Sequence, residues 1–485
     1  MRTMHSDFAR RDSGREPSVA SSNESSSSLP LKREQIIALL LLLVPNLIAW
    51  VLLFPGYFQA DHQLSMAKFI NGSPDLWHSI VWTVLAYPLI YLSPSYALYG
   101  LLQIALFVAC AYCSISRLVR LGLLRRMVPL AAVFGLFPAF VLYNELYSSD
   151  ICFAVLLISL TSMLVEIVET RGEAFRGRGF CIRLLLVCFF VVSLRKNAVL
   201  AGVVLCIVVP LTFRSVWKRA LLAIAGGVVA AVLLDAALSP VLGVKQSPSQ
   251  ELLSVPSLQI AATYNKGGVI PEDANRYFTA IRSEGDWAKA YSPDTADAAK
   301  QDVVLTPEFV WRWAELGLRN PGIYFRTYTQ LEYPFWSLVN EGETYMGVDF
   351  ACNEEFTHLP LQSGHESYAA QFDGVEAKST LWRVPSRLQF IVEQLRLPVL
   401  TDLYHLVFFN RGLPFWVVAI GIILSRGGSR RGAFSIVAIP VICVIVSLLV
   451  FAPVPLMRYA MQSCYSLPVL LVYLTRRTGF WARKG

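Results

Sequence analysis

The chain has 485 residues, of which 55% are hydrophobic and only 16% are charged, with a mean hydropathy of +0.50 and a formal net charge of +8. A chain this apolar is not a soluble globular protein, so we expect a membrane protein with many spans. The positive charge does not indicate nucleic-acid binding, because Lys and Arg fall mainly in short loops between apolar segments, as the positive-inside rule requires.

The chain begins with a polar segment, residues 1–34, that contains a serine tract and several basic residues. This composition predicts a disordered cytoplasmic tail. The apolar run 36–54 is longer than the core of a signal peptide, and no small-residue cleavage site precedes Gly56. We therefore expect an uncleaved membrane span. It belongs to a membrane domain, 35–241, whose first outer loop covers 56–95.

The stretch 77–92 is rich in apolar residues and contains Pro88, so it is either a span or a helix lying flat on the membrane surface. The charges that follow distinguish the two. If the stretch were a span, the next span, 96–115, would deliver a group of arginines to the outside, against the positive-inside bias. These arginines are Arg117, Arg120, Arg125 and Arg126. A flat helix places them in the cytoplasm, and we expect that arrangement.

The same charge rule places the later loops consistently. The remaining spans are expected near 127–144, 151–168, 180–194, 198–213, 219–241, 404–425, 432–452 and 459–475. With the two earlier spans this makes about ten transmembrane helices, and both chain ends are then cytoplasmic. The expected fold class is an all-α polytopic protein of the cell membrane, in which 404–485 forms the C-terminal membrane helices and a cytoplasmic tail.

Residues 242–403 separate the two groups of spans and are expected to form a mostly helical extracytoplasmic domain. Thr306, followed by Pro307, is typical of a helix start, and Asn320-Pro321-Gly322 is typical of a break between two helices. Aromatic residues crowd the stretch 306–338. They form a core, a membrane-interface belt, or a platform on which sugars stack. From its position, we expect this domain to govern the choice of acceptor.

Few ionisable residues are predicted at the outer edge of the membrane, where charge is costly and is usually kept for a function. The candidates are Asp61, His62 and His78 in the first outer loop, Asp150 in the second, Arg195 and Lys196 in the third, and Arg458 in the last. Asp75 in the first loop and Glu145 in the second are also expected at this edge and have no predicted role. Two acids from separate loops and cations from two further loops make a site able to hold a phosphate and perform acid–base chemistry.

The cations and the first acid have distinct expected roles. Asp61 is expected to act as the general base that takes a proton from an acceptor hydroxyl. Arg195 and Lys196 are expected to bind a lipid phosphate, and Arg458 to neutralise charge that develops on a leaving phosphate. The simpler alternative for Arg195 and Lys196 is that they extend towards lipid headgroups without a catalytic role.

The remaining candidates are expected to support the acceptor or a metal. They are His62, His78 and Asp150. Asp61 and Asp150 offer oxygen ligands for a hard divalent cation, and the sequence leaves open whether one is required. Asp150 alone is also explained as a helix N-cap after Ser148-Ser149, and each histidine as a structural hydrogen-bonding group.

Several of these positions occur in short motifs. The motifs are Asp61 in the first outer loop, His78-Ser79-Ile80-Val81-Trp82, Phe137-Pro138 leading into Ser149-Asp150, Arg195-Lys196-Asn197, and Arg458-Tyr459. In combination they resemble the GT-C class of multipass glycosyltransferases, which includes the polyprenyl-phosphate-mannose-dependent protein mannosyltransferases. The resemblance covers 36–241 and 400–475. His62 stands where the class commonly has a second acid, and Ser79 stands where proline is frequent.

The resemblance implies an inverting transfer of a sugar from a polyprenyl-phosphate donor to a glycan, lipid or protein of the cell envelope, at the outer face, with Asp61 as the base. No Gly-rich phosphate loop or DxD motif indicates a soluble nucleotide-sugar donor. Two other classes remain. A transporter or flippase of lipid-linked sugars would carry ionisable residues at mid-membrane and show matched halves, and an assembly scaffold would keep the fold alone.

Overall fold

The computed structural model describes residues 28–52, 57–58, 62, 65–66, 68–69, 72, 74, 79–92, 97–244, 249–339, 407–426 and 432–477. It is all-α, with 81% of it in helices. A short parallel pair joins β1 (Tyr57–Phe58) to β2 (Leu146–Tyr147). Residues 1–27 and 340–406 lie outside the described residues, and so do Asp61 and His78. The end of the predicted disordered tail was wrong, because α1 already begins at Ser28 and residues 28–34 are helical.

The helices of the N-terminal half follow the predicted order. They are α1 (Ser28–Leu52), α3 (Ile80–Leu92), α4 (Ala97–Arg120), α5 (Val128–Leu136), α6 (Pro138–Tyr143), α7 (Ser149–Glu169), η1 (Glu173–Arg176), α8 (Arg178–Leu194), α9 (Ala198–Thr212), η2 (Arg214–Val216) and α10 (Trp217–Val241). The C-terminal helices are α22 (Leu413–Ser425), α23 (Ala433–Phe451), α24 (Met457–Cys464) and α25 (Leu467–Arg477).

Each predicted span is covered, at least in part, by a helix or a pair of helices. Among the described residues, five helical stretches are long and apolar enough to cross a membrane: Lys32–Val51, Leu98–Arg120, Ser149–Glu169, Arg214–Val241 and Ala433–Phe451. The others are shorter or divided. The division at Phe137 has a local cause, because a residue before proline is driven out of the helical region, and Phe137 has φ −70° and ψ 115°.

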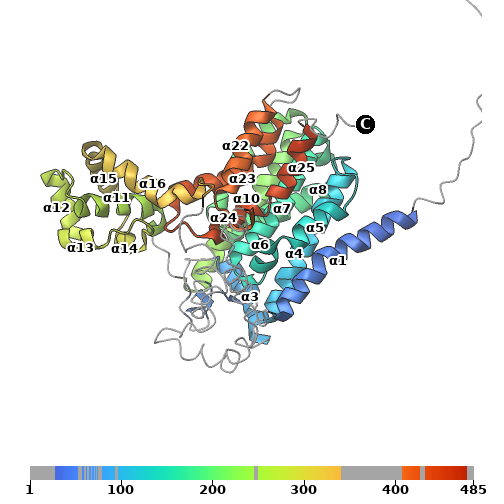
Figure 1. Cartoon of the computed structure of the whole chain (residues 1–485), viewed down its shortest axis with the longest axis horizontal. Coiled ribbons are helices and arrows are strands. Elements are labelled where there is room, and N and C mark those ends of the chain that lie inside the picture. Colours follow the sequence, from blue (N-terminus) through green and yellow to red (C-terminus); the bar gives the residue numbers. More distant parts are fainter. Residues whose placement is uncertain are drawn as a thin grey trace, which may run out of the picture.

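α7 is the central helix of the bundle. Of its most apolar stretch, 94% is buried, and it packs against α4, α8, α23 and α24. An apolar surface on all sides suits a helix enclosed by others. α1 is the opposite case, since only 22% of its apolar stretch is buried and it lies along the edge of the bundle (Figure 1).

Both ends of the described helix bundle lie at the same side. Near the start of α1, the Glu34 carboxylate accepts a hydrogen bond of 2.6 Å from the backbone N–H of Met127. Near the end of α25, Arg476 donates to the carbonyl of Leu123 at 2.9 Å. Both partners belong to the loop between α4 and α5. The chain therefore enters and leaves the bundle at this end, which we call the terminal end.

α3 lies at the opposite end, which we call the site end, and does not run from one end of the bundle to the other. Trp82, near its start, donates to the hydroxyl of Tyr99 in the first turn of α4 at 2.6 Å. Its last residue, Leu92, precedes Ala97, where α4 begins, by five positions, and α3 packs against α4. Figure 1 shows α3 at this end of the bundle.

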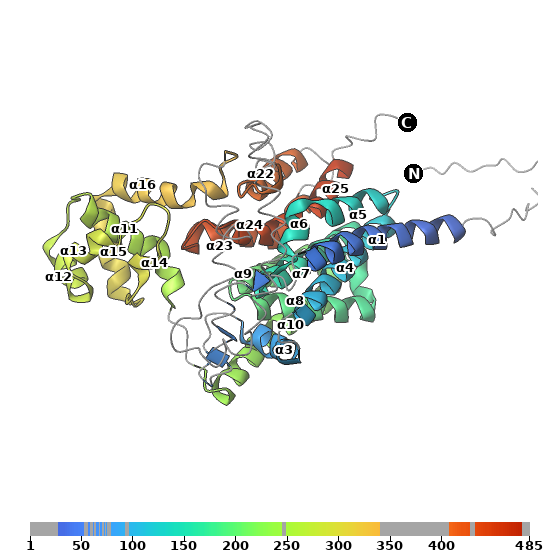
Figure 2. The ribbon, with the colours of Figure 1, turned by 60° about the horizontal axis from the view of Figure 1, so that its bottom comes forward.

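A separate helical domain covers 249–339. Its elements are η3 (Ser249–Leu253), α11 (Ser254–Asn265), α12 (Glu272–Ile281), α13 (Glu284–Lys289), α14 (Asp297–Lys300), α15 (Pro307–Arg319), α16 (Pro321–Glu332) and η4 (Tyr333–Phe335). The predicted helix start is confirmed, because the Thr306 side chain accepts from the N–H of Phe309 at 3.0 Å. The predicted break at Asn320 is confirmed too. Figure 2 shows this domain beside the bundle, with α16 running towards it.

The aromatic residues of this domain divide between its core and its surface. Within the stretch 306–338, Phe309 and Tyr324 are buried in the core of this domain, and Trp313 and Tyr328 pack against that core. In contrast, Trp311 and Phe325 are 67% and 71% exposed. The core explanation therefore accounts for most of these side chains, but not for the two exposed rings.

Candidate functional site

The first turn of α7 supplies the acid at the centre of the candidate site. Ser148 caps the helix, since its side chain accepts from the N–H of Ile151 at 3.3 Å. Asp150 is therefore not the N-cap, and that alternative is wrong. Its buried carboxylate lies within the first turn, where the positive end of the helix dipole favours a negative charge.

Asp150 forms an ion pair with Arg195. The distance from Arg195 Nη1 to Asp150 Oδ1 is 3.2 Å, and the two side chains are 20% and 3% exposed. Arg195 occupies the C-cap of α8 with extended backbone, so its side chain leaves the helix axis and turns towards α7. An arginine held in this way is not a free headgroup contact. The ion pair links the start of α7 to the end of α8.

α24 completes this cluster of side chains. In the amide orientation that turns the Gln462 oxygen towards Arg195, that oxygen accepts from Arg195 Nε at 3.2 Å and from Nη2. The Tyr459 ring lies 5.5 Å from the guanidinium carbon of Arg195 and 4.9 Å from that of Arg458. Arg458 also donates to the Tyr459 hydroxyl at 3.2 Å. One aromatic ring thus lies next to two cations, an arrangement that the ring quadrupole stabilises.

His62 attaches the first outer loop to the same helix start. Its Nε2 accepts from the backbone N–H of Ser149 at 3.0 Å and lies 2.7 Å from the Ser149 hydroxyl oxygen. Because a backbone N–H can only donate, Nε2 carries no proton, the ring is neutral, and the hydroxyl donates to it as well. The edge of Trp82 packs against the ring at a centroid distance of 4.8 Å. These contacts fit the structural explanation of His62, and its predicted support of the acceptor or a metal stays a prediction.

The structure thus brings together four of the seven predicted residues. They are His62, Asp150, Arg195 and Arg458. Lys196 is exposed, and the next residue, Asn197, donates to Ser447 of α23 at 2.9 Å. Asp61 and His78 fall outside the described residues, so their predicted roles stay predictions.

A layer of buried polar residues supports the segment that leads into Asp150. The Tyr465 hydroxyl donates to Asn144 Oδ1 at 2.9 Å, and Asn144 Nδ2 donates to Asn46 at 2.8 Å. Gln103 Nε2 donates to the carbonyl of Asn144 at 2.8 Å. Glu145, in the same segment, is fully buried, and burial raises the pKa of its carboxyl, an effect that Tyr147 partly offsets. These contacts hold the start of α7 in place.

The fit of a divalent cation depends on the donor set. In the part of the chain that the structure describes, no three His, Cys, Asp or Glu side chains come together as metal ligands. Asp150 already directs Oδ1 to Arg195. The described residues alone therefore do not form a metal site, and a cation would need oxygen ligands from the first outer loop as well.

Two residues of this region were missed by sequence reasoning. Gln462 carries no charge and so gave no signal. Arg411 is 2% exposed and donates to the carbonyl of Pro455. It stands inside the predicted span 404–425, where a charge is a signal in its own right. The prediction was wrong about where the long helix begins, because α22 begins at Leu413 and leaves Arg411 before it.

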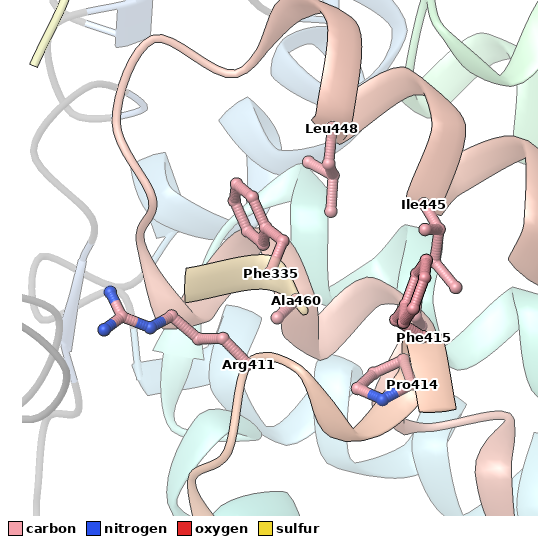
Figure 3. Close-up of a pocket in the computed structure, with 8 residues that line it drawn as sticks. Phe335, Arg411, Pro414, Phe415, Ile445, Leu448 and Ala460 are labelled. Atoms are coloured by element: carbon pink, nitrogen blue, oxygen red, sulfur yellow. The ribbon is translucent and has the colours of Figure 1, made fainter. Parts of the chain in front are cut away.

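Arg411 lies beside a small cavity with room for about one water molecule. The cavity is lined by Phe335, Arg411, Pro414, Phe415, Ile445, Leu448, Ala460 and Ser463. Figure 3 shows that the guanidinium of Arg411 points away from the apolar side chains of this lining. The charge of Arg411 is therefore directed to the neighbouring backbone and not into the cavity.

The protein is thus an all-α protein with apolar helices suited to a lipid bilayer, and it has a cluster of charged side chains at one end of the helix bundle. The sequence profile of DUF6020, a family of unknown function, matches residues 75–478. The chain belongs to this family. No curated protein and no solved structure matches the chain.

Proposed function

We propose that the protein is an integral membrane glycosyltransferase of the GT-C type. It moves a sugar from a polyprenyl-phosphate donor to an acceptor of the cell envelope, at the outer face of the membrane. The observation that carries the proposal is the meeting of three distant segments at one end of the bundle. Asp150, Arg195 and the pair Arg458-Tyr459 come from α7, α8 and α24, and they form one contact network.

The proposed topology has about ten spans with both termini in the cytoplasm. It is supported by the terminal end, where α1 starts and α25 ends beside the loop between α4 and α5. This loop contains Arg125 and Arg126, as the positive-inside rule expects for the cytoplasmic side. The site end then faces outwards, and α3 lies along the outer membrane surface.

In the proposed reaction, Asp61 takes the proton of an acceptor hydroxyl while the acceptor oxygen attacks the anomeric carbon of the donor. The new C–O bond forms on the face opposite the phosphate, so the configuration inverts. The bond between sugar and phosphate breaks, and the polyprenyl phosphate leaves with the electron pair. Arg458, Arg195 and Lys196 stabilise the charge on the departing phosphate.

The neighbours of these residues give each a supporting role in the proposed mechanism. Asp150 orients Arg195 through the ion pair. His62 holds the first outer loop against Ser149, and the residue before it in the sequence is Asp61. The proposed base therefore belongs to a loop that is tied to the phosphate-binding side chains.

The arrangement of charge favours an enzyme over a transporter of lipid-linked sugars. A transporter is expected to carry ionisable residues at mid-membrane. In the described apolar helices, Asp, Glu, Lys and Arg stand within about two turns of a helix end, for example in α7, α24 and α25. The charged cluster at the site end fits surface chemistry on a lipid-linked donor.

The test is transfer of radiolabelled sugar from a panel of polyprenyl-phosphate sugars in membranes that contain the wild-type chain or Asp61→Asn. Asparagine keeps the shape but cannot act as a base, so we expect transfer to fall by at least about 100-fold. Asp75→Asn changes another acid of the same loop and should retain transfer. Equal activity of Asp61→Asn and wild type would exclude Asp61 as the base. If the wild-type protein binds these donors but transfers no sugar, the proposal that it is an enzyme is wrong.

A further inference from the structure

The loop between α23 and α24, residues 452–456, accepts hydrogen bonds from two other parts of the chain. It contains Pro453 and Pro455, and proline has no backbone N–H with which to form hydrogen bonds. The carbonyl of Pro453 accepts from the N–H of Ala296, in the helical domain, at 2.8 Å. The carbonyl of Pro455 accepts from the Arg411 guanidinium. Two distant segments thus set the position of this loop, which we call the proline loop.

Arg411 is the middle residue of the segment Asn410-Arg411-Gly412, which contacts two different parts of the chain and which we call the clamp. On one side, Asn410 Nδ2 donates to the carbonyl of Leu338 at 2.9 Å. A Cβ on Gly412 would overlap the carbonyl of Ser337, so only glycine allows this close approach. On the other side, Arg411 holds the proline loop. The clamp therefore joins the chain that leaves the helical domain to the segment that enters α24.

The proline loop leads directly into the side chains of the candidate site. α24 begins at Met457, and its first turn carries Arg458 and Tyr459. The helix start has no side-chain cap that would fix it independently. A small displacement of the proline loop would therefore move Arg458 and Tyr459 away from Arg195, with which Tyr459 is now in contact.

We propose that Arg411 is a positioning residue that acts through Arg458. It fixes the proline loop, and so holds the first turn of α24 in the place where Arg458 and Tyr459 face Arg195. The role of that turn as the binding site of a polyprenyl phosphate rests on the proposed function. The contact between Arg411 and the loop does not depend on it.

The first test measures amide hydrogen exchange of the full chain in lipid nanodiscs. In Arg411→Met, peptides that cover 457–464 should exchange at least about tenfold faster, because the charged hydrogen bond to the loop is lost. Peptides of α11 should be unchanged. Arg411→Lys keeps a charged donor and should recover part of the protection. Arg476→Met is the matched control, since Arg476 also donates to a backbone carbonyl but at the terminal end. Unchanged exchange at 457–464 in Arg411→Met would overturn the inference.

The second test uses farnesyl phosphate as a probe and measures its dissociation constant for wild type, Arg411→Met, Arg458→Met and the double variant. The effects of substituting a positioning residue and the residue that it positions should not be additive. We expect each single variant to bind about tenfold more weakly, and the double variant no more weakly than Arg458→Met. Effects that multiply would mean that Arg411 contacts the phosphate itself, and would overturn the positioning role. If wild type does not bind the probe, the proposed function fails, and hydrogen exchange still decides the role of Arg411.

Discussion

Breaking the ion pair between Asp150 and Arg195 should destabilise the fold more than breaking any exposed pair. Both charges are largely removed from water, so deleting one leaves the other buried and uncompensated, at a typical cost of about 3–5 kcal/mol. In Arg195→Met, the described residues leave the Asp150 carboxylate with the helix start, which contributes roughly 0.3–1 kcal/mol. We expect that variant to lose about 3 kcal/mol. Asp150→Asn should lose about 2 kcal/mol, because Gln462 and Tyr459 remain around the guanidinium.

The assay is the free energy of unfolding of the full chain in mixed micelles of dodecyl maltoside and SDS. Wild type, the two single variants and the double variant form a cycle. The double variant should lose less than the sum of the single losses, by about 1–2 kcal/mol. Glu173→Gln is the control, because the side chains of its pair with Arg176 are 50% and 69% exposed, and its loss should stay below about 0.5 kcal/mol. Strict additivity in the cycle would refute the pairing.

Three further predictions concern the helical domain and its junction with the bundle. Burial raises the pKa of Glu332 from 4.5 to about 9, so the folded state retains a proton that the unfolded state releases, and stability should fall as the pH rises through that interval. Glu332→Gln should remove this fall in urea unfolding at pH 5 and pH 8, and an unchanged slope would contradict the assignment. Gly412→Ala should lower the thermal midpoint, at a cost of about 1–3 kcal/mol, whereas Gly285→Ala, where a Cβ meets open space, should not. Thr306→Ala removes a cap and should cost about 1 kcal/mol in the same measurement, with no loss expected if the cap is not formed.

The apolar pattern of the sequence was enough to predict where the long helices lie. Continuous apolar runs need internally hydrogen-bonded backbone in a membrane, so the position of α7 or α23 followed from composition alone. Local signals were equally informative, as the Thr306 cap shows. The helix ends were less predictable. The predicted span 404–425 did not use the local signal of Pro414, which stands in the first turn of α22 and is typical of a helix start near Leu413.

The candidate site was predictable to the extent that it consists of charge. Charged residues at the membrane edge are costly, so Asp150, Arg195 and Arg458 could be selected from the sequence. The sequence did not indicate which of them pair, because pairing depends on which helices are neighbours. Gln462 was missed for another reason, since the prediction rested on charged residues and a neutral amide carries no charge.

The order in which the ribosome makes the chain has a consequence for the cluster at the site end. His62 comes from the first outer loop and Asp150 from α7, whereas Arg458, Tyr459 and Gln462 belong to the last pair of helices. Until α24 is inserted, Arg195 lacks its aromatic and amide partners. A chain that stops before α24 therefore keeps the ion pair between Arg195 and Asp150 but lacks the contacts with Tyr459 and Gln462, so the cluster is assembled only when the C-terminal helices join the bundle.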